Sequence, residues 1–421
     1  MADLFGNLSR TERQEQCVQK WVDNKLRGSI IAATGFGKTN IGLMAIKRFL
    51  SKNDKKVIIV VPSEPIKEQW NRELVEWNMF NNCSVKTMFD VSKNKYECSL
   101  LVVDEVQRTL APTIISMYKN VKYQVILCLT ATLERLDGKD SFIKKVAPIV
   151  DSVTIEEAIN NKWLSAYKEY LVLINPEDIE TYKTVNREFL EHFSFFDNNF
   201  GVAMKCATDW KFRSELAKSK CSKDNFKDVY KQILVHSMGF SKTLQARKKY
   251  INNHPRKIEL TNLILENRTD KKCITFSATV AMAEKIKYGV VYSGKDSAKK
   301  GRITLEEYKT KDYAVINSVS KLNEGFNDPS ISVAVILGLN SSQIVSKQRS
   351  GRVLRLNGNK EAEIFNLIIK DTVELKWFQN SHPDGNYITI DESNLLPLLK
   401  GEEFNVKVNK SSNEATMKLR F

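Results

Sequence analysis

The heptapeptide Ala33–Thr39, Ala-Thr-Gly-Phe-Gly-Lys-Thr, constrains this chain more than any other feature. It follows the apolar run Ser29–Ala32 and precedes the helix-like run Asn40–Ile46. A strand, a glycine-containing turn and a helix in this order predict a phosphate-binding loop. Glycines let backbone N–H groups approach phosphate oxygens closely, and the helix N-terminus adds partial positive charge. The alternative is an ordinary glycine turn, which the Thr-Gly-x-Gly-Lys-Thr core between strand and helix disfavours.

The loop also gives single residues expected roles. Lys38 is expected to reach the β- and γ-phosphates of a nucleotide, and the Thr39 hydroxyl to bind Mg²⁺. Ala32 stands where the strict motif has its first glycine. The residues predicted to contact the nucleotide are Thr34, Gly35, Gly37, Lys38 and Thr39.

A pair of acids follows a second buried strand. The apolar run Leu100–Val103 ends in Asp104 and Glu105. We expect Asp104 to bind the metal, and Glu105 to orient and deprotonate the attacking water. Such a pair alone is a weak signal, since helix starts also favour acids. The next buried strand ends in Thr130–Thr132, whose hydroxyls could bond the acid pair.

Two arginines lie far downstream. On a helix, Gln348, Arg352 and Arg355 fall on one face. Paired guanidiniums suit the charge that develops on a transferring phosphoryl group. An exposed basic helix is the alternative. Because the phosphate loop and these arginines belong to different predicted domains, we expect ATP to bind between two lobes and hydrolysis to move them.

Size and charge fit this picture. The chain has 421 residues, which is more than a single hydrophobic core usually supports, so more than one domain is expected. Its net charge is +15. Residues 201–257 hold 14 Lys/Arg and 4 Asp/Glu, a balance that points to a polyanion such as nucleic acid. A solvated helical face is the alternative. Seven scattered cysteines without a C-x-x-C pair predict reduced thiols rather than zinc or disulfides.

Apolar runs predict two α/β domains, with a helical stretch between them. Buried strands of a parallel sheet are indicated near 29–32, 57–61, 100–103 and 125–129, and of a second sheet near 273–276, 314–316, 333–336 and 364–369. The four phenylalanines between positions 193 and 200 are expected to form a helical core, with a DNA wedge as the alternative. The predicted divisions are 1–160, an ATP-binding domain; 161–258, a linker and basic helical insertion; 259–380, a second domain; and 381–421, a tail of unknown role.

These motifs, in this order, resemble superfamily 2 helicases and translocases. The matching segments are Ala33–Thr39 (motif I), Val61–Ser63 with Gln69 and Trp70 (Ia), Asp104–Gln107 (II), Thr130–Thr132 (III), Ile274–Ser277 (IV), Ser318–Pro329 (V) and Gln348–Arg355 (VI). Thr130–Gly138 is similar to a string found in a DNA-directed branch that includes phage UvsW-type and bacterial RecG-like remodelling helicases. Leu133 stands where that string has proline.

The resemblance implies two RecA-like domains in tandem, with ATP and Mg²⁺ as cofactors. It further implies an adenine contact by Gln14 and a nucleotide contact by Gly325, although Arg13 replaces the aromatic residue expected beside Gln14. Asn327 stands where motif V usually has aspartate. The residues implied to contact nucleic acid are Ser63, Gln69, Arg135, Ser277, Gly294, Ser318 and Ser320.

The expected function is that of an ATP-dependent DNA helicase that remodels forks or branched DNA by branch migration in replication, recombination or repair. A duplex translocase, an RNA helicase and an ATP-gated clamp are the alternatives. We expect a monomeric protein of the cytoplasm, the host's if the chain is phage-encoded, with no membrane span and no identified protein partner.

Overall fold

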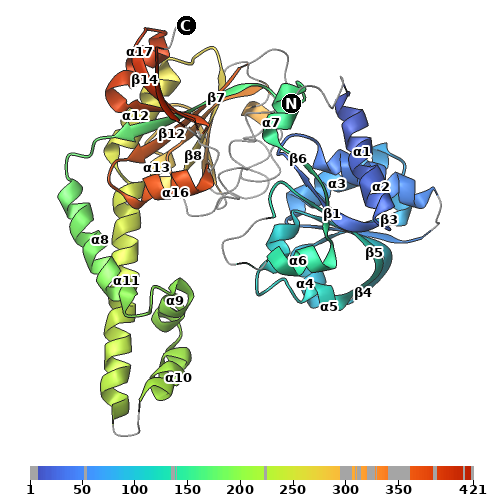
Figure 1. The fold of residues 1–421 in the computed structure, drawn as a ribbon, viewed down its shortest axis with the longest axis horizontal. Coiled ribbons are helices and arrows are strands. Elements are labelled where there is room, and N and C mark those ends of the chain that lie inside the picture. The colour runs from blue at the N-terminus through green and yellow to red at the C-terminus, as the bar shows by residue number, and fades with distance from the viewer. Residues whose placement is uncertain are drawn as a thin grey trace.

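The computed structural model describes residues 8–51, 55–133, 138, 140–221, 225–293, 306–308, 310, 314–319, 328, 330–339, 361–382, 386–410 and 413–418, with the backbone alone for 405–418. Within these ranges the chain forms two lobes, each built around a sheet, and a helical arm projects from the second lobe (Figure 1). This is the predicted α/β architecture with helical content between the sheets.

The first sheet has six parallel strands in the order β3-β2-β4-β5-β1-β6. The four predicted strands form its interior. The two that the sequence did not indicate, β3 and β6, lie at its edges and are partly exposed. The strands are β1 (Arg27–Ala32), β2 (Val57–Val61), β3 (Cys83–Thr87), β4 (Tyr96–Asp104), β5 (Val121–Thr130) and β6 (Ile149–Val153).

Helices cover both faces of this sheet, because alternate residues of its buried strands point to opposite sides. Val57, Ile59 and Val61 belong to the core under one layer, whereas Ile58 and Val60 belong to the core under the other. The first layer contains α1 (Arg10–Asp23), α2 (Lys38–Leu50), α3 (Glu64–Glu76) and α7 (Ile155–Asn160); the second contains α4 (Met88–Lys93), η2 (Val106–Leu110), α5 (Met117–Asn120) and α6 (Asp140–Val146); η1 (Phe80–Asn82) precedes β3.

The second sheet has nine strands in the order β15-β14-β13-β7-β12-β11-β8-β10-β9. The segment from β13 to β9 is parallel, and β14 and β15 add an antiparallel hairpin. The strands are β7 (Tyr167–Ile174), β8 (Lys272–Ser277), β9 (Val290–Ser293), β10 (Val315–Val319), β11 (Ile331–Ile336), β12 (Ala362–Ile369), β13 (Tyr387–Asp391), β14 (Asn405–Lys410) and β15 (Asn413–Lys418).

Two strand placements differ from the predicted domain divisions. Strand β7 lies within 161–258, which was assigned to linker and insertion, yet it pairs with β12 over its whole length. Strands β13 to β15 lie within the predicted tail, yet β13 pairs in parallel with β7. The second lobe therefore begins before the arm and continues after residue 380, and the arm interrupts it.

The described helices of the second lobe also lie on both faces of the sheet. α12 (Pro255–Glu266), α13 (Val280–Ala283) and α17 (Leu395–Lys400) contribute to one core, and α16 (Val373–Ser381) to the other; η4 (Glu392–Asn394) precedes α17. A fully buried ion pair joins the two layers, since Lys257 Nζ on α12 lies 2.6 Å from Glu374 Oε1 on α16. Both side chains are completely buried. Lys257 Nζ also donates to the Leu337 carbonyl and Glu374 Oε2 accepts from the Ile369 N–H, so the two helices are fixed at the ends of β11 and β12.

The arm consists of α8 (Ile179–Ser194), α9 (Phe200–Thr208), α10 (Trp210–Lys220) and α11 (Phe226–Asn252), the last of 27 residues. Its aromatic residues form the expected core. Phe196 is buried beside Phe240, while Phe193 and Phe195 pack against the same cluster. Phe200, however, is 50% exposed at the start of α9. No helix within the described ranges is both long and apolar enough to cross a bilayer.

Candidate nucleotide and nucleic-acid site

The predicted phosphate loop lies at the C-terminal edge of the first sheet, between β1 and α2 (Figure 1). Gly35 and Gly37 have φ of +90° and +102°, in the left-handed region that glycine tolerates. Helix α2 starts at Lys38, directly after Gly37. A Cβ at Gly37 would also lie 2.6 Å from Nε2 of Gln14, so a larger residue would have to displace that side chain from the loop.

Helix α1 holds the loop from one side. Gln14 Nε2 donates to the Phe36 carbonyl at 2.7 Å, and Arg10 Nε donates to the same oxygen at 2.9 Å. In a trans peptide the next N–H points opposite to the carbonyl. The N–H of Gly37 therefore faces away from α1, as a phosphate cradle requires. Gln14 also accepts a hydrogen bond from Asn40, so its carboxamide supports the loop in this arrangement.

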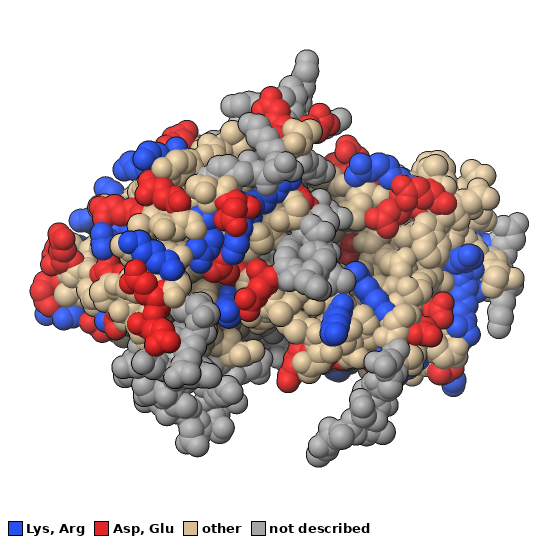
Figure 2. All heavy atoms as spheres, turned by 90° about the horizontal axis from the view of Figure 1, so that it is seen from above, with Lys and Arg blue, Asp and Glu red and all other residues tan. Residues whose placement is uncertain are grey.

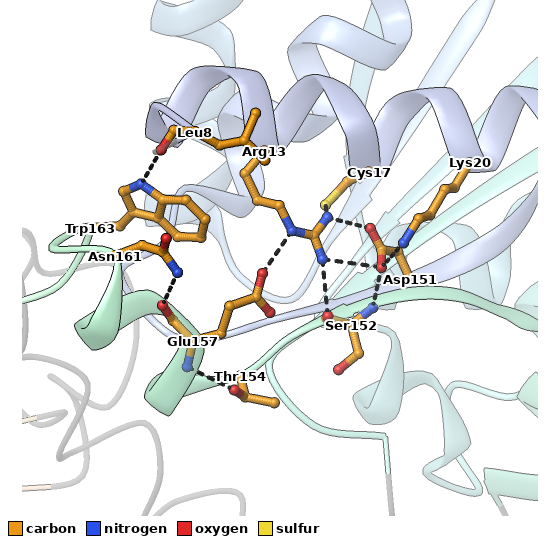
Figure 3. Close-up of polar contacts among 10 residues, drawn as sticks. All are labelled: Leu8, Arg13, Cys17, Lys20, Asp151, Ser152, Thr154, Glu157, Asn161 and Trp163. Carbon is orange, nitrogen blue, oxygen red and sulfur yellow. Dashed lines mark hydrogen bonds and ion pairs between the residues drawn. The ribbon is translucent and has the colours of Figure 1, made fainter. Parts of the chain in front are cut away.

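Arg13 occupies the position where an aromatic residue was expected, and it fastens α1 to the rest of the lobe (Figure 3). Its guanidinium is buried and binds both oxygens of Asp151 on β6. Arg13 Nε lies 2.7 Å from Glu157 Oε1 on α7. Lys20 also bonds to Asp151, at 2.8 Å. The departure from the family pattern is thus a buried ion network that positions the helix carrying Gln14.

The acid pair ends β4, which lies next to β5 and one strand away from β1. Lys38 Nζ is 3.6 Å from Glu105 Oε1. Gln107 Nε2 donates to the other Glu105 oxygen at 2.7 Å, and Thr130 Oγ1 donates to Gln107 Oε1 at 2.6 Å. Residues from three separate sequence motifs therefore form one chain of polar contacts, with Thr130 joined to the acid pair through Gln107.

Asp104 is a buried carboxylate whose surroundings suit a cation. Burial, together with the neighbouring Glu105 carboxylate, raises the pKa of Asp104 above its usual range, and nearby Lys38 opposes this shift. Its two oxygens accept hydrogen bonds from Trp70 Nε1 at 3.1 Å and from the Glu105 backbone N–H at 3.0 Å. A carboxylate and the Thr39 hydroxyl are oxygen donors of the kind Mg²⁺ prefers, so the residues present fit that ion.

Glu105 has a backbone conformation that L-residues rarely adopt, with φ of +52° and ψ of +49°. Such conformations cost about 1–3 kcal/mol and persist where neighbouring contacts enforce them. Here the conformation turns the chain from β4 into η2 and places the Glu105 carboxylate against Lys38 and Gln107.

Four of the residues implied to contact nucleic acid lie within the described ranges. Ser63 directly precedes α3 and makes no capping bond of its own, and Gln69 lies on this helix. Ser277 is the last residue of β8 and Ser318 the second-last residue of the adjacent strand β10, but both are buried. Ser277 Oγ has no hydrogen-bond partner among the described residues. A contact through either of these two serines would require their exposure.

Several predicted site residues lie outside the described residues, and their roles stay predictions. They are Arg135, Gly294, Ser320, Gly325, Gln348, Arg352 and Arg355. Conversely, two residues that support the site were given no role from the sequence. Arg10, one helical turn before Gln14, was not named, and Trp70 was named in motif Ia without a function.

Two family models match the chain in separate segments. Residues 7–97 match "Type III restriction enzyme, res subunit", and residues 256–357 match "Helicase conserved C-terminal domain". The first covers the phosphate loop and α3, and the second covers much of the second lobe. The two matches follow the order of the two sheets.

Two relatives align with most of the chain. The DNA 3'-5' translocase XPB2 of Sulfurisphaera tokodaii is 25% identical over 388 residues, covering 86% of this chain and 82% of the relative. Putative helicase 22 of Sulfolobus islandicus filamentous virus is 22% identical over 398 residues, covering 84% of this chain and 63% of that protein. The chain thus spans less than two thirds of the viral relative.

A solved structure supports the fold. S. cerevisiae Dbp5 bound to RNA and ADP BeF3 superposes with a TM-score of 0.59 at 13% identity, covering 92% of this chain and 91% of that chain. The order of motifs, the two parallel sheets and the matches to both family models agree. The chain is therefore similar to the helicases and translocases of superfamily 2, whose members hydrolyse ATP.

Proposed function

We propose that the protein is an ATP-dependent DNA helicase that remodels forked or branched DNA, as the UvsW-type and RecG-like resemblance implies. The observation that carries the ATP-hydrolysing part of this proposal is the 3.6 Å contact between Lys38 Nζ and Glu105 Oε1, which joins the phosphate loop to the acid pair. The two motifs are far apart in sequence and meet because β1 and β4 both flank β5 in a parallel sheet.

In this proposal each residue at the sheet edge has a stated part. Lys38 and the loop amides bind the β- and γ-phosphates, while Thr39 and Asp104 hold Mg²⁺, which supplies charge neutralisation when bound. Glu105 accepts the proton of the attacking water, and Gln107 orients its carboxylate. Arg352 and Arg355 complete the site from the second lobe, as their sequence pattern suggests. The protein acts in the cytoplasm as a monomer.

The arm supports a grip on DNA. Lys227, Lys231, Lys242 and Lys249 of α11 are exposed, and their spacings of four, eleven and seven residues are close to whole turns. They therefore form one stripe, interrupted by exposed Val235 and Met238. Such a stripe spans about 33 Å at ~1.5 Å per residue, close to one turn of duplex DNA.

Elsewhere the charges are mixed. On the face in Figure 2, which looks onto the end of the molecule opposite the arm tip, acidic and basic side chains are interspersed. The predicted surplus of positive charge in residues 201–257, with 14 Lys/Arg against 4 Asp/Glu, instead lies on the arm and at its base. This distribution favours the arm as the element that binds DNA phosphates.

A second candidate is a duplex translocase that does not separate strands. The observation that favours it is the similarity to a protein described as a DNA 3'-5' translocase. In this case the same ATP site and the same arm would move along a duplex.

One experiment separates the candidates. ATP turnover and strand release are measured with single-stranded DNA, duplex, a fork, a four-way junction and RNA of matched length. The proposal predicts the strongest stimulation and strand release with forks or junctions. Stimulation by every duplex without strand release would favour the translocase, stimulation by RNA alone would contradict a DNA enzyme, and absence of turnover with all five would favour an ATP-gated clamp.

A further inference from the structure

Trp70 connects helix α3 to the acid pair. Its indole is completely buried, and its Nε1 donates a hydrogen bond to Oδ2 of Asp104 at 3.1 Å. The other oxygen of Asp104, Oδ1, accepts from the backbone N–H of Glu105 at 3.0 Å. The Asp104 carboxylate is thus oriented by one donor from the residue that follows it and one from helix α3.

The same indole packs on the helix that follows the phosphate loop. A Cβ at Gly42, one turn after Lys38 on α2, would lie 2.5 Å from Cη2 of Trp70 and 3.1 Å from Cδ1 of Leu129. Gly42 therefore leaves the space that the ring fills. Protein interiors are close-packed, so a shift of α3 would press the indole against α2. The same shift would displace the hydrogen-bond donor of Asp104.

Helix α3, together with the residue before it, carries two residues that the resemblance to helicases implies to contact a nucleic-acid strand, and the proposed function includes these contacts. Ser63 is at its N-terminus and Gln69 precedes Trp70 on the helix. Gln69 Nε2 bonds to Glu73 Oε1 at 2.8 Å, within α3, and both side chains are partly buried. One rigid helix thus holds a strand-contacting surface and the donor to Asp104.

We propose that Trp70 is a positioning residue that orients Asp104 for Mg²⁺ and makes this orientation depend on the position of α3, so that strand binding tunes metal affinity. The inference rests on the proposed function, specifically on Asp104 as a metal ligand and α3 as a strand contact. Groups that orient metal ligands typically change metal affinity about 10- to 100-fold.

The test measures binding of a fluorescent, non-hydrolysable ATP analogue as Mg²⁺ is titrated, with and without single-stranded DNA. For the wild type we expect DNA to lower the half-saturating Mg²⁺ concentration. Trp70→Phe keeps an aromatic ring but removes the N–H, so it should raise that concentration about 10-fold or more and abolish the DNA effect. Trp77→Phe, at the other end of α3, is the matched control and should behave as wild type.

The outcomes are distinguishable. A folded Trp70→Phe protein with the wild-type Mg²⁺ dependence and DNA response would overturn the inference, since packing alone would then explain the residue. If Trp70→Phe does not fold, Gly42→Ala displaces the indole without removing it and should raise the Mg²⁺ requirement; an unchanged requirement would again overturn the inference. Asp104→Asn tests the proposed function separately, because an unaltered Mg²⁺ dependence there would reject Asp104 as the ligand.

Discussion

At the residue scale, Glu105 is held by contacts on both of its carboxylate oxygens. Lys38 approaches one oxygen, and Gln107 donates to the other. The surrounding residues therefore fix the orientation of this carboxylate, independently of any role as a base. Its assigned chemistry is proton acceptance from water, which an amide cannot perform.

Glu105→Gln should retain ATP binding and lower turnover by about 100-fold or more, the range typical for removing a general base. The measurement is steady-state ATP hydrolysis beside equilibrium binding of a fluorescent nucleotide. Glu97→Gln, on the exposed part of the same strand, is the control and should keep wild-type turnover. A Glu105→Gln enzyme working at full rate would exclude Glu105 as the base.

Arg13 gives a stability prediction. Its buried guanidinium neutralises Asp151 and contacts Glu157, so Arg13→Met leaves a buried carboxylate without its main partner. The unfolding free energy of the first lobe should fall by about 3–5 kcal/mol. Lys20→Met removes the half-exposed partner of the same carboxylate and should cost only about 1 kcal/mol or less. Denaturant titration of both variants checks this, and equal losses would contradict the assigned role.

The sequence predicted the residues of this site better than their contacts. Lys38 and Glu105 could be predicted from local sequence, because a lysine after a glycine turn indicates phosphate binding and an acid after a buried strand indicates a metal ligand or a base. The bond from Trp70 to Asp104 and the support of Phe36 by Gln14 depend on how α3 and α1 pack on the sheet. No local pattern encodes that packing.

At the element scale, the lysine stripe of α11 determines how the arm would bind DNA. Replacing Lys227, Lys231 and Lys242 by Gln should weaken duplex binding and make its salt dependence shallower, by about 2 to 3 in the slope of log K against log salt. The control variant replaces Lys55, Lys119 and Lys122 by Gln and so removes the same amount of charge. These lysines are exposed near the N-terminal ends of strands in the first sheet. Equal effects in both variants would mean that net charge, and not the stripe, drives binding.

A histidine pair joins α8 to α11 within the arm. His192 Nδ1 and His236 Nδ1 lie 3.2 Å apart, and the His236 ring stacks on Phe195 at 4.1 Å. Burial, followed by the neighbouring His192, lowers the pKa of His236, while Glu191 opposes the shift. The unfolded state then binds this proton more readily than the folded state, so the arm should lose stability as the pH falls below about 6.5.

Hydrogen exchange of α8 and α11 peptides at pH 7.5 and 5.5, corrected for intrinsic rates, measures this loss. His236→Gln cannot titrate, and the decrease in protection should be smaller in that variant. The same decrease in both proteins would show that His236 does not link the arm to pH.

Strands buried on both faces were predicted correctly because short, continuous apolar runs such as Val57–Val61 are typical of strands in a parallel sheet. Edge strands were missed for the opposite reason. In β3 only Val85 is buried, and in β6 only Asp151 and Val153 are buried. Strand β7 was missed because it lies beside the arm, whose helical pattern dominated that region. Its position between β12 and β13 depends on the strand order of the sheet, which cannot be predicted from local composition.

At the scale of the whole molecule, one chain forms two mostly parallel sheets with an arm inserted into the second lobe (Figure 1). Both connections of the arm leave this lobe near one cavity of about 850 Å³, lined in part by Asp178 and Tyr250. Tyr250 Oη donates to the Asp178 carbonyl at 2.8 Å, so the first and last helices of the arm are joined at its base. A load on the arm would therefore reach the second lobe at this point.

The Lys38 loop and the acid pair form, in our proposal, a nucleotide site at which DNA stimulates ATP hydrolysis. The most direct test compares DNA-stimulated ATP hydrolysis and DNA binding in Lys38→Ala with Lys47→Ala, an exposed lysine of the same helix. We predict that Lys38→Ala abolishes hydrolysis while DNA binding stays measurable, and that Lys47→Ala retains both. Undiminished DNA-stimulated hydrolysis in Lys38→Ala would contradict the account.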